Sequence, residues 1–309
     1  MSSSVESDPS LSDTGEFVAE DRGGGAYYES EPRLRVRVEF AGRSHPGKVR
    51  ENNEDHYLAS RRYRGREILG TSLPVETLDT AEDHAYAFSV ADGMGGACFG
   101  EIASQLALQT GWELGGNEIK WAVKMNDREE EELRRKAEVF FTLIDDALQN
   151  EARANPRLAG MGTTLTLCYS TGPELFVMHA GDSRAYLFRD GRLTRLTHDH
   201  TMGQVLVDSG TVEPGSPVAR RMSSILTNCL GGPDRPVTVE VSHHRLQHDD
   251  VLLLCTDGLT DMLGDPEIAD VLGRRLPCPD AADALLHWSL ERGGRDNVTV
   301  LLARYAIEA

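Results

Sequence analysis

Two apolar runs in this chain end in the same dipeptide, Asp-Gly. The first run covers residues 85–91 and stops at Asp92-Gly93. The second covers residues 251–256 and stops at Asp257-Gly258. Each run predicts a buried β-strand that carries one carboxylate at its end, with a glycine behind it. Because an unpaired buried carboxylate is costly, an acid in this position needs a cation, a proton or several hydrogen-bond donors.

Two further acids stand beside predicted strands. Asp55 closes the polar run 50–54 and leads into a strand over 55–60, and Asp296 precedes the final strand, 298–305. Four strand-end carboxylates from distant parts of one chain indicate a shared site for hard cations, which prefer oxygen ligands.

The usual structural role of a single Asp-Gly is a turn, since glycine accepts positive φ and aspartate caps its own backbone. Asp190-Gly191, between the strands predicted over 185–188 and 192–196, fits this role and predicts a hairpin. Asp92-Gly93 and Asp257-Gly258 differ because the residues after them do not begin a return strand. Their occurrence together with the other two acids favours metal binding.

Composition limits the partners and the compartment. A net charge of -18 argues against nucleic acid as a partner, because phosphate backbones are bound by Lys and Arg. No run approaches the ~20 apolar residues of a membrane span. The N-terminal residues are acidic, which argues against a secretory signal. The five cysteines lack paired spacing and favour reduced thiols in the cytoplasm; they are Cys98, Cys168, Cys229, Cys255 and Cys278.

The chain divides into a short tail and one domain. Residues 1–32 are rich in Ser, Gly, Asp and Glu and are expected to form a disordered acidic tail. Residues 33–309 contain no internal repeat or linker and are expected to fold as a single, monomeric domain.

The periodicity of the domain predicts an α+β fold. Strands are expected at 34–40, 55–60, 85–91, 164–169, 175–180, 185–188, 192–196, 237–242, 251–256 and 298–305. Helices are expected at 101–114, 129–154, 266–273 and 280–292. Residues 201–236 show no clear period and are expected to be irregular. Grouped strands with helices in two blocks favour antiparallel sheets.

Six motifs occur in a fixed order: His45-x-Gly47-x-x-Arg50-x-x-Asn53-Glu54-Asp55, Val90-Ala91-Asp92-Gly93-Met94-Gly95-Gly96, Gly162-Thr163-Thr164, Ala180-Gly181-Asp182-Ser183-Arg184, Cys255-Thr256-Asp257-Gly258-Leu259 and Arg295-Asp296-Asn297-Val298-Thr299. Together they resemble the metal-dependent serine/threonine protein phosphatases (the PPM, or PP2C-type, family) in their bacterial form. The resemblance covers roughly residues 33–306. One motif alone would be a weak signal, whereas six in order are specific.

The resemblance implies a fold and an activity. The fold is an α-β-β-α sandwich of two antiparallel β-sheets flanked by helices, with a metal site at one end between the sheets. The activity is hydrolysis of phosphoserine and phosphothreonine in proteins by a metal-bridged water, in opposition to a Ser/Thr kinase. The implied partners are phosphorylated proteins, including a cognate kinase.

The resemblance also implies a ligand set for two Mn²⁺ or Mg²⁺ ions, with Asp92 as the bridge: Asp55, Asp92, the backbone carbonyl of Gly93, Asp257 and Asp296. Glu54 would act through a bound water. Asp182 and Asp261 match positions that hold a weaker third ion. For Asp182 the residues alone favour a turn paired with Arg184.

Arg50 corresponds to the arginine that binds the substrate phosphate in this family. A planar guanidinium donates two parallel hydrogen bonds to phosphate oxygens, which a lysine cannot reproduce. The alternative is a surface arginine or an ion pair with Glu51.

Met94 departs from the animal members, which carry a histidine there that is thought to protonate the leaving alcohol. A thioether cannot donate a proton, so the general acid is unassigned and a metal-bound water is the simplest candidate. His198-Asp199-His200 could hold a metal or act as a base, but its place between a strand and a helix favours loop anchoring. Residues 201–232 correspond to a variable flap that is expected to influence substrate choice.

Two other functions are compatible with the same fold. One is a catalytically silent binding module, and the other is a specialised phosphatase of one regulatory partner, or a nuclease. A silent relative would be expected to lose Arg50 or the metal acids, and here all of them remain. The low positive charge argues against a nuclease.

Overall fold

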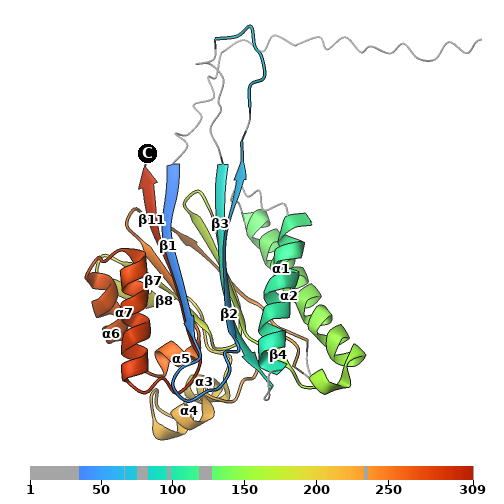
Figure 1. Ribbon diagram of the computed structural model, residues 1–309, viewed down its shortest axis with the longest axis vertical. Coiled ribbons are helices and arrows are strands. Elements are labelled where there is room, and N and C mark those ends of the chain that lie inside the picture. The colour runs from blue at the N-terminus through green and yellow to red at the C-terminus, as the bar shows by residue number, and fades with distance from the viewer. Residues whose placement is uncertain are drawn as a thin grey trace, which may run out of the picture. The chain divides into compact units, whose positions relative to one another are not determined.

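The computed structural model describes residues 35–65, 67–74, 83–95, 99–117, 127–232 and 236–308. The tail expected over 1–32 and Cys98 lie outside the described residues. The described residues form two antiparallel sheets that lie between pairs of helices, as Figure 1 shows. The predicted α-β-β-α sandwich is therefore confirmed.

Each sheet joins strands from distant parts of the chain. The first sheet contains, in spatial order, β1 (Arg35–His45), β11 (Val298–Glu308), β10 (Val251–Cys255), β7 (Arg184–Arg189) and β8 (Arg192–Arg195). The second contains β2 (Asp55–Arg64), β3 (Asp83–Met94), β5 (Leu165–Thr171), β6 (Glu174–Ala180) and β9 (Glu240–Arg245). The short strand β4 (Gly162–Thr163) pairs with the end of β3.

Helices cover the outer faces of the sheets (Figure 1). Helices α1 (Phe99–Asn117) and α2 (Asp127–Ala154) pack on the second sheet, and α6 (Asp265–Gly273) and α7 (Cys278–Glu291) pack on the first. Helix α2 is positioned by apolar residues at helical spacing, all of them buried: Leu133, Ala137, Phe140, Phe141, Ile144 and Leu148. The helix ends before Pro156, which opens a 3-10 turn, Pro156–Leu158.

Between the sheets lies a third apolar layer. Side chains from both inner faces meet there, among them Phe88 of β3, Leu252 of β10 and Tyr305 of β11. The buried Tyr305 hydroxyl hydrogen-bonds to Ser170 Oγ at 3.0 Å, which links the sheets through a polar contact. This layer fixes the distance between the sheets and therefore the spacing of the residues at their ends.

The region expected to be irregular, residues 201–236, contains two short helices. Helix α3 (Met202–Asp208) is capped by Thr201 Oγ1, and α4 (Pro217–Met222) is capped by Ser216 Oγ. With 7 and 6 residues, neither is long enough to show a hydrophobic period. Their N-cap hydroxyls, together with Pro217, were the available sequence signals.

The hairpin predicted at Asp190-Gly191 is confirmed. Arg189 pairs with Arg192 across it. Asp190 and Gly191 have φ values of 49° and 79°, as a two-residue type I′ turn requires. The dipeptides at Asp92 and Asp257 have a different role, described below.

Candidate active site

The second sheet places two acids opposite one another. Asp55 is the first residue of β2, and Asp92 lies near the end of β3. In the antiparallel register of these strands, Asp55 is the direct partner of Asp92. Directly opposed like charges destabilise a strand pair, so this register needs a compensating cation or a proton.

The first sheet contributes the other two acids at the same end. Asp257 follows β10 and begins the short helix α5 (Asp257–Thr260), and Asp296 lies just before β11. Since β10 and β11 are antiparallel neighbours, the end of one lies beside the start of the other. Thr256 Oγ1 donates to Asp55 Oδ2 at 2.7 Å and joins the two groups. The four predicted carboxylates are thus brought together.

The glycine of each Asp-Gly pair allows two backbones to approach closely. A Cβ on Gly93 would lie 2.0 Å from the carbonyl oxygen of Gly100, and one on Gly258 would lie 1.9 Å from that of Asn297. Neither glycine is in the left-handed region. Their role is steric, and differs from that of Gly191 in the hairpin.

Burial makes the carboxyls difficult to ionise without a cation. Asp55 is 3% exposed, and burial, reinforced by the charges of Asp257 and Asp296, raises its pKa to about 7. Burial also raises the pKa of Asp257 to about 7. For Asp92, burial and then the charge of Asp55 raise the pKa well above its usual range. Each negative charge makes ionisation of the neighbouring acids less favourable, as expected for a group of carboxylates that binds cations.

The donor set fits divalent cations of the Mg²⁺ and Mn²⁺ type. Within the described part of the chain, Asp55 Oδ1 is buried and has no hydrogen-bond partner. Buried carboxylate oxygens normally have a partner, and a bound cation would be the partner of this oxygen. Every candidate ligand offers oxygen, which these hard ions prefer.

Arg50 lies beside the acids with most of its side chain in solvent. Its Nη2 donates to Asp296 Oδ2 at 2.7 Å, and the side chain is 58% exposed. The structure pairs it with Asp296 rather than with Glu51. The hydrogen bond to Asp296 raises the pKa of Arg50, so its positive charge is permanent.

Glu54 is fixed through its backbone. Its N–H donates to Asn297 Oδ1 at 2.8 Å. Its carbonyl oxygen accepts from the N–H of Gly93 at 3.1 Å and from Ser104 Oγ at 2.6 Å. The residue therefore connects β2, β3 and α1 beside the acids.

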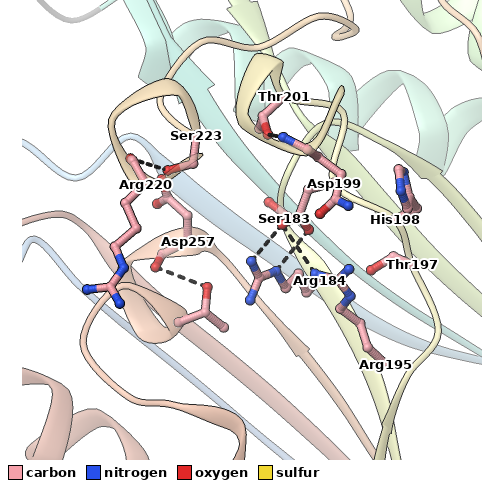
Figure 2. Close-up of polar contacts among 12 residues, drawn as sticks. Ser183, Arg184, Arg195, Thr197, His198, Asp199, Thr201, Arg220, Ser223 and Asp257 are labelled. Carbon is pink, nitrogen blue, oxygen red and sulfur yellow. Dashed lines mark hydrogen bonds and ion pairs between the residues drawn. The ribbon is translucent and has the colours of Figure 1, made fainter. Parts of the chain in front are cut away.

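Asp182 and Asp261 lie near the same group. Burial, followed by the charge of Asp257, raises the pKa of Asp182 well above its usual range. Asp261 ends α5, and burial raises its pKa as well. The predicted pairing of Asp182 with Arg184 is wrong. Arg184 binds Asp199 instead, with Nε at 2.9 Å and Nη2 at 2.6 Å from the two carboxylate oxygens (Figure 2).

Asn297 is a structural residue of the site for which the sequence predicts no role. Its Oδ1 accepts from Glu54 N–H, and its Nδ2 donates to the carbonyl oxygens of Pro46 at 3.0 Å and Asn52 at 2.7 Å. It is 6% exposed. One amide therefore holds the loop that carries Arg50 against the start of β11. The available signals were a polar amide at the start of a core strand and its place in the motif that begins at Arg295.

A histidine group close by resembles a metal site but is used for hydrogen bonding. His179, His200 and Glu240 can place ligand atoms within 4.8 Å of one another. His200 Nδ1 accepts the N–H of Gly181 at 3.1 Å, so in the neutral ring its Nε2 carries the hydrogen and faces Glu240. Burial lowers the pKa of His179 to about 3, and its Nε2 lies 3.1 Å from the His198 carbonyl. Loop anchoring, as the sequence favoured, accounts for these contacts.

A hollow of about 560 Å³ lies away from the acids, between α1, α2 and the outer face of the second sheet. Small residues on both sides, such as Ala87 of β3 and Gly111 of α1, line it. None of the candidate site residues is part of its wall.

Comparison with known proteins agrees with this geometry. The family model described as Protein phosphatase 2C matches residues 77–291. The serine/threonine protein phosphatase PstP of Mycobacterium tuberculosis is 34% identical over 272 residues. The chain belongs to the protein phosphatase 2C family. The alignment with PstP covers 88% of this chain and 46% of the relative, so the chain spans about half the length of that protein.

A second relative and a solved structure of PstP extend the comparison. The serine/threonine phosphatase stp of Listeria welshimeri is 32% identical over 213 residues, which cover 69% of this chain and 82% of the relative. The crystal structure of the PstP catalytic domain in complex with two manganese ions has a TM-score of 0.68 at 31% identity. It covers 88% of this chain and 100% of the solved one. Among the residues that the structure describes, no helix is both long and apolar enough to cross a membrane.

Proposed function

We propose that this chain is a metal-dependent protein-serine/threonine phosphatase. One observation carries the proposal: Asp55, whose buried Oδ1 has no partner among the described residues, lies with three other carboxylates at the ends of the two sheets, and an exposed arginine lies beside them. The PstP catalytic domain, whose solved structure contains two manganese ions, shares the fold and supports the assignment.

The ligands would be the residues of the acid cluster. Two Mn²⁺ or Mg²⁺ ions would be held by Asp55, Asp92, the carbonyl of Gly93, Asp257 and Asp296. Glu54 would act through a water, and Asp182 with Asp261 would hold a weaker third ion. When bound, such ions neutralise phosphoryl oxygens and lower the pKa of water.

Arg50 would bind the phosphate of the substrate. Its Nη2 donates to Asp296, which orients the guanidinium. The side chain is mostly in solvent, so the other N–H groups of the guanidinium can reach a substrate. A planar arginine suits a phosphate because two N–H groups can bind two oxygens together. Met94, next to the acids on β3, offers no proton to a leaving alcohol.

The substrates would be phosphorylated proteins, including a cognate kinase, and the protein would act as a monomer in the cytoplasm. The unpaired spacing of the five cysteines along the chain is the support for a reducing compartment.

Hydrolysis of a phosphothreonine peptide tests the proposal. Activity should require added Mn²⁺ or Mg²⁺, should disappear in EDTA and should return with excess Mn²⁺. Full activity after exhaustive chelation would refute the metal assignment. A folded protein that binds Mn²⁺ without turnover of any phosphopeptide would favour the silent binding module.

A further inference from the structure

The segment His198-Asp199-His200 binds the chain on both sides of Asp182. On the N-terminal side, His200 N–H donates to the carbonyl oxygen of Gly181 at 2.7 Å, and Gly181 N–H donates back to His200 Nδ1 at 3.1 Å. Gly181 has a φ of 120°, and a Cβ there would lie 2.5 Å from Thr164. The position next to Asp182 is therefore held by a reciprocal pair of bonds.

On the C-terminal side the contact is an ion pair whose carboxylate is buried. Asp199, 7% exposed, accepts both Nε and Nη2 of Arg184, and Arg195 Nη1 lies 3.3 Å from the same carboxylate. Arg184 Nη1 donates to Tyr186 Oη at 3.1 Å, and this hydroxyl donates to Asp265 at 3.1 Å. Figure 2 shows Arg184 directed at Asp199. A bidentate pair fixes the guanidinium in direction as well as in position.

The same segment continues directly into the flap, residues 201–232. Thr201 caps α3, and the N–H of Met202 donates to the carbonyl oxygen of Ile225 at 2.8 Å. The N–H of Thr227 returns to the carbonyl oxygen of His200, also at 2.8 Å. The start of the flap and its residue Thr227 are thus tied to His200, one of the residues that hold Asp182.

We propose that Asp199 is a positioning residue that fixes Asp182 and the base of the flap as one unit. It acts through Arg184 on one side of Asp182 and, through the adjoining His200, on the other. The inference rests on the proposed function, since Asp182 is a candidate ligand there, and it assigns to His198-Asp199-His200 a task that neither metal binding nor acid–base chemistry requires.

The chain provides a matched control on the same strand. Arg189, at the other end of β7, forms an equally bidentate pair with the fully buried Asp250, at 2.8 Å and 2.6 Å. The two arginines are five residue steps apart along the β-strand, which corresponds to roughly 16 Å. Asp199→Asn and Asp250→Asn therefore remove the same kind of contact, one beside the acids and one far from them.

The experiment compares these two variants with the unaltered protein. Both should lower the melting temperature. Only Asp199→Asn should weaken at least one Mn²⁺-binding step, by about tenfold in titration calorimetry, as loss of a residue that orients a ligand typically does. Only this variant should speed hydrogen exchange at the amides of Met202 and Thr227, by about tenfold. It should also raise KM for a phosphopeptide more than for p-nitrophenyl phosphate.

The exchange and calorimetric readouts do not depend on turnover, so they separate this inference from the proposed function. If the unaltered protein binds Mn²⁺ but hydrolyses no phosphopeptide, the function fails and the positioning role is still measured. If either readout stays at its original value in Asp199→Asn, or changes equally in Asp250→Asn, the pair is only structural and the inference is wrong. Should Asp199→Asn not fold, Arg184→Lys, which keeps the charge but loses the bidentate geometry, must show the same two changes.

Discussion

Asp55 and Asp250 are both buried aspartates, one at the acid cluster and one at the opposite end of the first sheet. Asp250 is 0% exposed and receives two N–H groups of Arg189 as well as the backbone N–H of Gln247. Asp55 is 3% exposed, receives the hydroxyl of Thr256 on one oxygen and has no partner on the other among the described residues.

The difference is that Asp250 has a positively charged side chain of the same chain as its partner, whereas Asp55 does not. At Asp250 an arginine compensates the buried charge, so removing either partner should be destabilising. At Asp55 the neighbours are further acids, so ionisation opposes folding until a cation arrives. Substitution of each aspartate by asparagine, which keeps the shape and removes the charge, therefore tests the comparison directly.

The largest expected effect is on turnover at the acid cluster. Asp92→Asn and Asp257→Asn should each lower kcat by at least about a thousandfold, because several kcal/mol of charge stabilisation depend on a complete ligand set. The measurement is phosphopeptide hydrolysis at saturating Mn²⁺. Asp250→Asn serves as the control and should keep its kcat once corrected for folded protein. Near-normal rates in either cluster variant would mean that these acids only form turns.

Stability should change in the opposite sense at the two ends. Asp250→Asn should lower the free energy of unfolding by about 1.5–3 kcal/mol, because it weakens the charged hydrogen bonds from Arg189, whose side chain is 30% exposed. In EDTA, Asp55→Asn should melt at the same temperature as the unaltered protein or higher, since repulsion with Asp92 is relieved. Chemical denaturation measures the free energy for Asp250→Asn, and thermal denaturation in EDTA measures the melting temperature of Asp55→Asn. A large loss of stability in Asp55→Asn would show that its charge is already compensated without metal.

Arg50→Ala should have a smaller effect on catalysis. Loss of charged hydrogen bonds to phosphate should lower kcat/KM by about ten- to a hundredfold. The decrease should be equal for phosphopeptide and p-nitrophenyl phosphate, because Arg50 would bind the group that they share. Met94→Ala is the control and should leave the ratio between the substrates unchanged. A loss confined to the phosphopeptide would instead place Arg50 at the leaving group.

The smallest expected effect is a dependence of stability on pH. Asp55 has a folded pKa of about 7 against 3.8 in the unfolded chain. Its unfavourable contribution is therefore absent below about pH 4, grows as the pH rises towards 7 and is complete above that. In EDTA, Asp55→Asn should melt a few degrees above the unaltered protein at pH 8, and this difference should shrink at pH 5.5. Buried His179 and His200 add the opposite dependence to both proteins and cancel in the difference. A difference that is independent of pH would contradict the raised pKa.

The positions of the four acids could be predicted because each belongs to a local pattern, an apolar run that ends or begins at a carboxylate. The partner of Arg184 could not be predicted in this way. Asp182 is two residues away, whereas Asp199 becomes adjacent only after the β7–β8 hairpin returns the chain. The hydrogen bonds of Asn297 could not be predicted for the same reason, since its partners lie 243 to 251 residues earlier in the sequence. Patterns of spacing identify strand ends, but three-dimensional packing selects their partners.

The pairing of β1 with β11 also determines when the site can exist. Arg50 and Asp296 are 246 residues apart, and β11 lies between β1 and β10 in the first sheet. A chain that leaves the ribosome from its N-terminus exposes β1 long before it can find this neighbour, and such distant pairing slows folding. Until β11 has been synthesised, the emerged chain contains Asp55, Asp92 and Asp257 without the strand that completes their sheet. The acid cluster is therefore assembled only at the end of synthesis of this domain, so a nascent chain that stalls earlier cannot display it.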